Sequence, residues 1–385
     1  MKRNVFLLAM CQGLMLTATS LLLSTSALIG ARLTEDQTFA TVPLALQFFG
    51  MMLASFSASM IMKKVGRRSG FLIGLFIALF GVTLSGTAIV QGSFIGYCAG
   101  SLMMGIFNGF GAYYRFAAVE VAPPNFRARA ISYVMAGGIV AAFIGPNFAA
   151  ISRDWIAGAE FAGSYYGLIT VYLLSIICIS FIHFPQQSFE SSNQVGRPLR
   201  QIIRQPVFFV AVFGALVGYG VMNLIMSSTP LAMDACGFAF GQTAQVIQWH
   251  VVGMFLPSFF TGNLIDRFGV LNIMIIGAVV MLLTLAVNLH GITYAHFIVA
   301  LILLGIGWNF LFVGGTALLT EAYELSERSK TQGINDFMIA TAVTFTALSS
   351  GYLNFTFGWT TINLTAIPVI LLVLCALIWL KLKRN

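Results

Sequence analysis

Charged residues are scarce in this sequence. Only 8% of its 385 residues are charged, whereas soluble domains average about 25%. Because 58% of the residues are hydrophobic, too little polar surface exists to cover a water-soluble globule. The same composition excludes a disordered chain, and apolar runs of about twenty residues exclude the alternating strands of a transmembrane β-barrel. We therefore predict an all-α membrane protein that crosses the bilayer many times.

Cysteine pairs and catalytic motifs are also scarce. The five cysteines are odd in number and show no C-x-x-C spacing, which argues against a disulfide framework or a zinc site. No G-x-x-x-x-G-K-[ST] segment is present, so ATP does not drive the protein directly. No Ser/His/Asp arrangement suggests catalysis. We expect no enzyme activity, no cofactor, no metal and no nucleic-acid partner.

Twelve apolar runs are each long enough to span a bilayer, which takes about 20 residues. The first follows Lys2 and Arg3 and is too long for a cleaved signal peptide. The runs cover residues 5–30, 39–62, 69–91, 94–121, 130–152, 164–184, 206–232, 242–265, 270–289, 295–320, 333–354 and 362–380.

The placement of lysine and arginine predicts the orientation, because these residues gather on the cytoplasmic side of membrane proteins. With the N-terminus in the cytoplasm, 17 of the 20 basic residues face the cytoplasm. Only Arg32 and Arg153 then lie outside, and only Arg115 lies within a span. Both termini are therefore predicted to be cytoplasmic, in a bacterial-type inner membrane.

An internal repeat divides the chain into two halves. Residues 50–66 and 253–269 share six of 17 positions at an offset of 203, and a polar stretch from His183 to Gln205 separates six spans from six. We expect an N-terminal six-helix bundle over residues 1–184, a cytoplasmic linker over 185–205 and a C-terminal six-helix bundle over 206–385. Arg197 to Arg204 are expected on the anionic membrane surface. Parallel repeats of this kind are typical of secondary transporters, which bind solute between the halves.

Two loop motifs carry a family resemblance. The segment Gly262-Asn-Leu-Ile-Asp-Arg-Phe-Gly269 is similar to the G-x-L-x-D-R-x-G loop signature of the major facilitator superfamily, and Gly66-Arg67-Arg68 is similar to its G-R-R end. The chain resembles this superfamily along its whole length. The resemblance implies two six-helix bundles that alternate access to a central site, and a protein that functions as a monomer.

The loop charges suggest a cytoplasmic gate. We expect Glu120 to pair with Arg67 or Arg68, and Asp266 to pair with Arg328 or Lys330, in the outward-facing state, with both pairs breaking when the inside opens. The alternative is that these charges only set the topology. The predicted gate comprises Gly66, Arg67, Arg68, Glu120, Asp266, Arg267, Gly269, Glu321 and Arg328.

Arg115 is the leading candidate for solute contact, because a charge within a span costs about 2.5–3.5 kcal/mol or more to insert. With its neighbours Tyr113 and Tyr114 it could hold an anionic group and stack on a flat ring. The alternative is a structural bridge from Arg115 to Glu120.

Other polar residues within the spans have two interpretations each. His250, beside Trp249 and matched by Gln47 in the repeat, carries a coupling proton or is a core histidine. Asp336 titrates or caps a helix and serves a gate. Five further candidates contact solute or bond neighbouring helices: Gln12, Asn108, Asn223, Trp308 and Asn309.

The expected function is secondary active transport of a small organic solute, with protons as the coupling ion. No Asp or Glu lies in the middle of spans 1, 2, 5 or 7, which favours a neutral or anionic solute, aromatic, vitamin-like or siderophore-type. Gly145-Pro146 resembles an element of the antiporter branch, so a drug or metabolite exporter is the alternative. A solute sensor that does not transport is the distant alternative.

Overall fold

The computed structural model describes residues 2–123, 127–184 and 196–384, which contain helices and no β-strand. The helices of the N-terminal part are α1 (Lys2–Leu33), η1 (Gln37–Phe39), α2 (Val42–Val65), α3 (Arg67–Gln91), α4 (Phe94–Gly111), α5 (Tyr114–Val121), α6 (Arg127–Ser152) and α7 (Ala162–Ser180). Those that follow are α8 (Leu199–Ile203), α9 (Pro206–Ala235), α10 (Phe240–Phe255), α11 (Ser258–Phe268), α12 (Val270–His290), α13 (Tyr294–Leu319), η3 (Thr320–Ala322), η4 (Leu325–Glu327) and α14 (Arg328–Arg384).

The predicted spans differ in continuity from the observed helices at three places. The run 94–121 is divided by a turn at Ala112 and Tyr113 into α4 and α5. The run 242–265 is divided at Pro257 into α10 and α11, because proline cannot donate the backbone hydrogen bond that would continue the helix. Conversely, the last two runs join in α14, which bends at Gly358, where φ is 80°.

Within the described residues, nine helices are long and apolar enough to cross a membrane. This count takes the bent α14 once, and it leaves out α10 and α11, which are 16 and 11 residues long. Length and composition of single helices therefore recover the predicted spans only in part.

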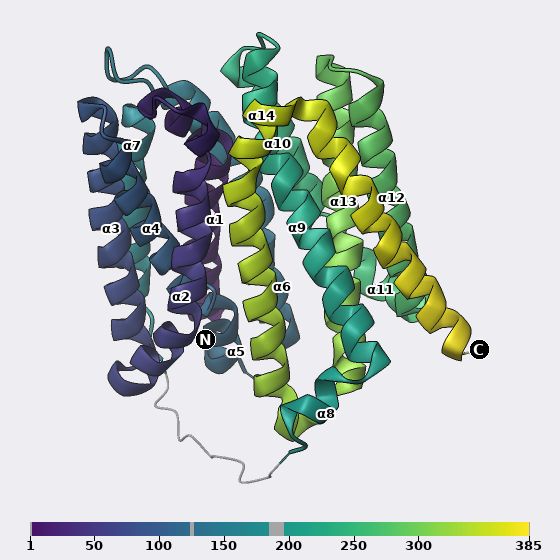
Figure 1. The fold of residues 1–385 in the computed structure, drawn as a ribbon. Helices are drawn as coiled ribbons and strands as arrows, with labels where there is room; N and C mark the ends of the chain where they lie inside the picture. The colour runs from purple at the N-terminus through teal and green to yellow at the C-terminus, as the bar shows by residue number, and fades with distance from the viewer. Residues whose placement is uncertain (1, 124–126, 185–195, 385) are drawn as a thin grey trace.

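The buried apolar side chains form two large clusters that follow the order of the chain. One draws almost entirely on helices α1–α7, which we call the N-terminal half, and the other on α8–α14, the C-terminal half. Figure 1 shows the two halves side by side, with both chain ends toward the end of the molecule where α8 lies. We call this the α8 end. Helix α6 contacts α10, and α2 contacts α14, across the boundary. Residues 185–195 of the predicted linker lie outside the described residues.

Glycines allow helix backbones to touch, and they do so alike in both halves. A Cβ atom on Gly105 of α4 would lie 2.0 Å from the carbonyl oxygen of Gln47 on α2. A Cβ atom on Gly305 of α13 would lie 2.6 Å from the carbonyl oxygen of His250 on α10. Gln47 and His250 occupy matching positions of the 203-residue repeat. The repeat therefore recurs as one packing arrangement, in which small residues bring helices close together.

Replacing Gly105 by alanine is expected to destabilise the protein by about 1–3 kcal/mol or more, because the added methyl group meets backbone that cannot move aside. Thermal unfolding in detergent measures the effect. Gly262→Ala is the matched control, since a Cβ there meets nothing within 4 Å. Equal melting temperatures for the two variants would contradict the packing argument.

Candidate functional site

The α8 end of the N-terminal half contains a bidentate ion pair. Arg67, the first residue of α3, approaches the carboxylate of Glu120 with Nε at 3.1 Å and Nη2 at 2.6 Å. The ring of Tyr113 lies 5.5 Å from the Arg67 guanidinium. Arg68 instead donates to the carbonyl of Ser180, at 2.6 Å. The pair therefore ties α3 to α5 inside one half. A simple gate would bridge the two halves, and this pair does not.

The pairing predicted for Asp266 in the outward-facing state is not formed in this structure. Asp266 is exposed on α11, and no residue that the structure describes forms an ion pair with it. Its expected partners have other contacts: Arg328 reaches Gln332 at 3.5 Å, and Lys330 donates to the carbonyl of Arg197. Both predicted partners of Asp266 therefore make contacts elsewhere.

The other gate residues of the C-terminal half serve local contacts. Glu321 pairs with Arg384 at 2.6 Å, which ties the end of α13 to the end of α14. Arg267 lies over the ring of Phe268, at 5.2 Å. Gly269 and Gly66 have φ values of 85° and 84°, a region that glycine enters without strain. Each therefore allows the sharp turn between two helices.

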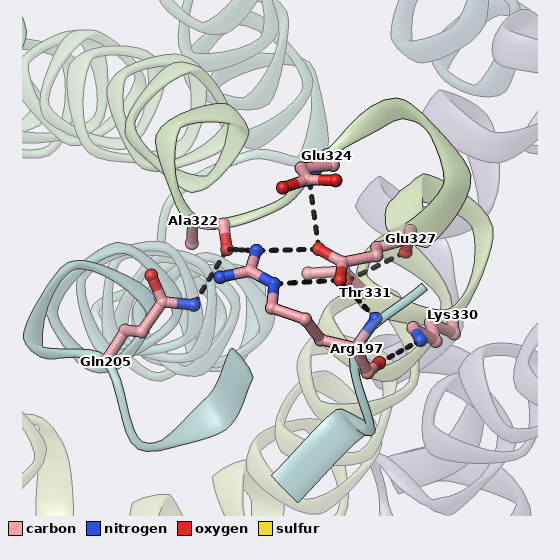
Figure 2. A network of polar contacts seen from close by, with 7 residues as sticks. All are labelled: Arg197, Gln205, Ala322, Glu324, Glu327, Lys330 and Thr331. Carbon is pink, nitrogen blue, oxygen red and sulfur yellow. Dashed lines mark hydrogen bonds and ion pairs between the residues drawn. The ribbon is translucent and has the colours of Figure 1, made fainter. Parts of the chain in front are cut away.

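A buried carboxylate holds the end of the linker (Figure 2). The side chain of Glu327 is 0% exposed and accepts from the backbone N, Nε and Nη2 of Arg197, at 2.6, 2.8 and 2.7 Å. The backbone N of Glu324 adds a fourth hydrogen bond, at 3.0 Å. The placement of Arg197 on the membrane surface is therefore wrong, because a buried anion offers it a bidentate partner. Acidic loop residues are common, so no feature of the sequence predicts this pair.

These contacts shift the ionisation of both partners. The Arg197 guanidinium, with the backbone N–H of Glu324, lowers the pKa of Glu327 to about 2. The hydrogen bond from Glu327 raises the pKa of Arg197. The ion pair therefore persists throughout the physiological range of pH.

At the end opposite α8, an aromatic pair joins the two halves. The rings of Phe161, before α7, and Phe240, at the start of α10, lie 4.7 Å apart at 72°. The Arg153 guanidinium lies over both rings, at 5.5 and 5.7 Å. Glu160 forms ion pairs with both Arg32 and Arg153. In the sequence, Arg32 and Arg153 stand out only as the two external charges. Their contact with the aromatic pair leaves no signal there, because Phe161 and Phe240 are far apart in the chain.

Polar contacts accompany this aromatic pair. The backbone N of Gly351 donates to Thr41 Oγ1 at 3.0 Å, which joins α14 to α2. Asn147 on α6 donates to Gln248 on α10 at 2.6 Å. Trp249, 42% exposed, contacts the Phe143 ring of α6. The contacts that join the halves thus extend from the middle of the helices to the end opposite α8.

The predicted anion site at residues 113–115 is not assembled. Tyr114 is fully buried against Phe71, with ring centroids 4.7 Å apart, in the core of the N-terminal half. Arg115 is exposed and makes no bridge to Glu120, which is held by Arg67. The turn at Ala112 starts α5 in a new direction, so these neighbours in sequence point to different sides.

Arg115 nevertheless has an electrostatic partner in the other half. Its charge interacts electrostatically with Asp336 on α14. Asp336 accepts from the Asn335 amide at 3.1 Å. It does not cap the helix, because α14 already begins at Arg328. The two opposite charges therefore lie across the boundary between the halves.

Three of the polar candidates, Asn309, His250 and Asn223, bond neighbouring helices. Asn309 is buried, donates to the Met254 carbonyl at 2.8 Å and accepts from Thr261 at 2.7 Å, which fixes the break between α10 and α11. The Nδ1 of His250 lies 2.8 Å from the Leu301 carbonyl, so His250 is a core histidine that joins α10 to α13. Gln12 is buried in α1 and Asn108 is half-buried in α4.

Four aromatic rings cluster on the C-terminal side of the boundary. Trp308 and Phe312, one turn apart on α13, stack at 5.0 Å and 9°, and Tyr219 of α9 meets both edge-on, at 5.3 and 5.4 Å. Phe255 of α10 lies 6.4 Å from Trp308. We call these four residues the boundary aromatic cluster. Only Trp308 of these four was a candidate from the sequence, because helices that are apolar all round show no periodic signal.

Several buried polar atoms near the boundary have no hydrogen-bond partner among the described residues. Burying such an atom unpaired costs about 1–3 kcal/mol. In membrane proteins polar groups of this kind often mark the route of a solute. The unpartnered atoms include Ser20 Oγ, Gln47 Oε1, Asn223 Oδ1, Ser227 Oγ and Trp308 Nε1.

Comparison with known proteins identifies the class. The model of the Major Facilitator Superfamily matches residues 5–248 and 235–385, so the chain belongs to this family. It is therefore a multi-pass membrane protein and a secondary transporter of a small solute.

Individual relatives are also full-length. The riboflavin transporter RfnT of Brucella anthropi is 37% identical over 99% of this chain and 96% of its own. The uncharacterized MFS-type transporter YddS of Bacillus subtilis is 26% identical over 91% of this chain and 85% of its own. Among solved structures, the nucleoside transporter NupG has a TM-score of 0.72 with 16% identity over 97% of this chain and 98% of its own. A bacterial homolog of the lysosomal transporter Spinster scores 0.70 with 13% identity over 98% and 95%.

Replacing Glu327 by glutamine is expected to lower the melting temperature at pH 7, because Arg197 then loses its ionic partner. The stabilisation by Glu327 is complete above its ordinary pKa of 4.5 and is lost as pH falls toward about 2. The difference in melting temperature between the wild type and the variant should therefore shrink between about pH 5 and pH 3. Glu35→Gln, at an exposed carboxylate, is the control. A difference that stays constant with pH would contradict the assignment.

Proposed function

We propose that the protein carries riboflavin, or a solute with a similar flat heteroaromatic ring, across the inner membrane by alternating access. The observation that carries the proposal is the 37% identity to a riboflavin transporter over 99% of this chain. In this proposal, twelve spans form two six-helix bundles, over residues 1–184 and 206–385, and both termini are cytoplasmic.

The charge distribution supports a solute that is not a cation. The unpartnered atoms and aromatic rings at the boundary are neutral groups. The carboxylate of Asp336 interacts with the positive charge of Arg115, so it is not a lone negative charge at the boundary. A neutral ring system matches such a lining, whereas a cationic drug would lack a counter-ion there.

We assign proton coupling to Asp336 rather than to His250. Asp336 is accessible and interacts electrostatically with Arg115 of the other half, so protonation would change the attraction between the halves. His250 is fully buried within one half and is bonded to the Leu301 carbonyl. The proton is therefore proposed to act where the two halves face each other.

The ion pair of Arg67 and Glu120 has a revised role in this proposal. It remains formed while the two halves meet at the end opposite α8. We propose that it holds α5 against α3, so that the N-terminal half moves as one body.

Export of drugs, the alternative, loses its main support. A Cβ atom on Gly145 would lie 2.7 Å from the Thr17 carbonyl of α1. This close packing inside one half accounts for the glycine without an antiporter role.

Riboflavin is expected to enter liposomes that contain the purified protein, and an imposed pH gradient should change its rate of entry. Protein-free liposomes are the control, and uridine and a cationic dye are the comparison solutes. Movement of the cationic dye without riboflavin would favour the exporter. Binding of riboflavin without flux would favour a sensor. Whether flux runs with or against the proton gradient distinguishes symport from antiport.

Glu120→Gln is expected to slow riboflavin transport several-fold and leave its Kd nearly unchanged, because the pair shapes one half without contacting solute. Exchanging the two charges, with Arg67→Glu and Glu120→Arg together, should restore part of the rate. Glu35→Gln is the matched control, at an exposed carboxylate at the end opposite α8. Loss of binding in Glu120→Gln would place this pair at the solute site instead.

A further inference from the structure

The boundary aromatic cluster contacts the N-terminal half on two sides. Phe48 of α2 packs against the same small buried cluster, formed by Ala215, Ile339 and Val343, as Tyr219 and Phe312 do. On the other side, the Phe255 ring lies against Gly138 of α6, where a Cβ atom would be 3.2 Å from it. Trp308 lies between these two contacts, so it stands at the boundary where alternating access would expose a solute.

Trp308 carries a donor that the protein itself does not use. Its side chain is 6% exposed, and its Nε1 has no hydrogen-bond partner among the described residues. Buried indole N–H groups usually find a partner. The Tyr219 and Phe312 rings fix the indole plane. The N–H therefore has a defined direction and an unfilled requirement for an acceptor.

Asn223 supplies the complementary acceptor. It lies four residues after Tyr219, on the same face of α9. Its Nδ2 donates to the Val343 carbonyl at 3.0 Å and to Thr346 Oγ1 at 3.1 Å. The two bonds fix the amide, and its Oδ1 remains buried and unpartnered. One donor and one acceptor thus remain unsatisfied beside a set of flat rings.

We propose that Trp308 and Asn223 determine which solute is accepted, by reading an imide edge on a flat heteroaromatic ring. Trp308 Nε1–H donates to a ring carbonyl, and Asn223 Oδ1 accepts the neighbouring imide N–H. The ring itself packs against the boundary aromatic cluster. This inference rests on the proposed function and adds the chemical feature of the solute that is recognised: a site built to satisfy polar groups rejects rings that lack them.

The test is a binding titration with the purified full chain in detergent, with riboflavin as the probe. Trp308→Phe keeps a ring and removes only the N–H and the second ring, and it should raise the riboflavin Kd about 3- to 10-fold. Trp359→Phe is the matched control. Trp359 also has an unpartnered Nε1, but it packs on Phe297 within the C-terminal half.

A change to the ligand keeps the test decisive if Trp308→Phe fails to fold. Riboflavin methylated at the imide nitrogen should bind the wild-type protein about 3- to 10-fold more weakly than riboflavin. The fluorescence of bound riboflavin should be almost completely quenched, because the flavin then lies against indole and phenol rings.

The outcomes separate this inference from the proposed function. Riboflavin transport with equal Kd values for the wild type, Trp308→Phe and Trp359→Phe, and for the methylated flavin, would overturn the inference and leave the function standing. Binding of uridine but not riboflavin, weakened in Trp308→Phe alone, would overturn riboflavin as the solute and support the inference. If the wild type binds no imide ring, both are overturned.

Discussion

The lipid bilayer imposes the constraint on which the rest of this structure depends: backbone polar groups there have no water to bond, so helices must satisfy them internally. Almost every described residue is helical for this reason. Because lipid gives little hydrophobic drive for helices to associate, close packing of small residues takes over. Gly105 and Gly305 are the examples that the two halves share. In such an interior a buried polar atom without a partner is conspicuous, and Trp308 Nε1 and Asn223 Oδ1 are two of them.

Composition was sufficient to predict the helical class. The predicted spans follow the apolar runs, but the breaks at Pro257 and at Gly358 within α14 depend on local backbone geometry. Arg67 and Arg68 were predicted as alternative partners of Glu120, and Arg67 is the one that pairs with it, whereas Arg68 donates to the Ser180 carbonyl. The predicted site that combines Tyr114 with Arg115 is not assembled. The two residues are neighbours in sequence, but their side chains point to different sides of α5, and Tyr114 packs on Phe71.

The two ends of the molecule use different chemistry. At the α8 end, the ion pairs of Arg67 with Glu120 and of Arg197 with Glu327 lie within single halves. At the opposite end, aromatic rings under an arginine join one half to the other. Ion pairs need fixed geometry, whereas ring contacts tolerate sliding and separation. Rigid bodies joined by a separable aromatic contact are what a rocking mechanism requires.

Phe161 adds an energetic consequence to that contact. Its φ of 67° places a bulky side chain in the left-handed region, a conformation that costs about 1–3 kcal/mol. The ring and guanidinium contacts that it makes contribute a similar amount, about 0.5–2 kcal/mol each. Strain at this backbone position therefore offsets part of the attraction that the ring and guanidinium contacts supply. Because each 1.4 kcal/mol of differential binding shifts a two-state balance about tenfold, a solute that binds one arrangement only slightly better still shifts the balance between them.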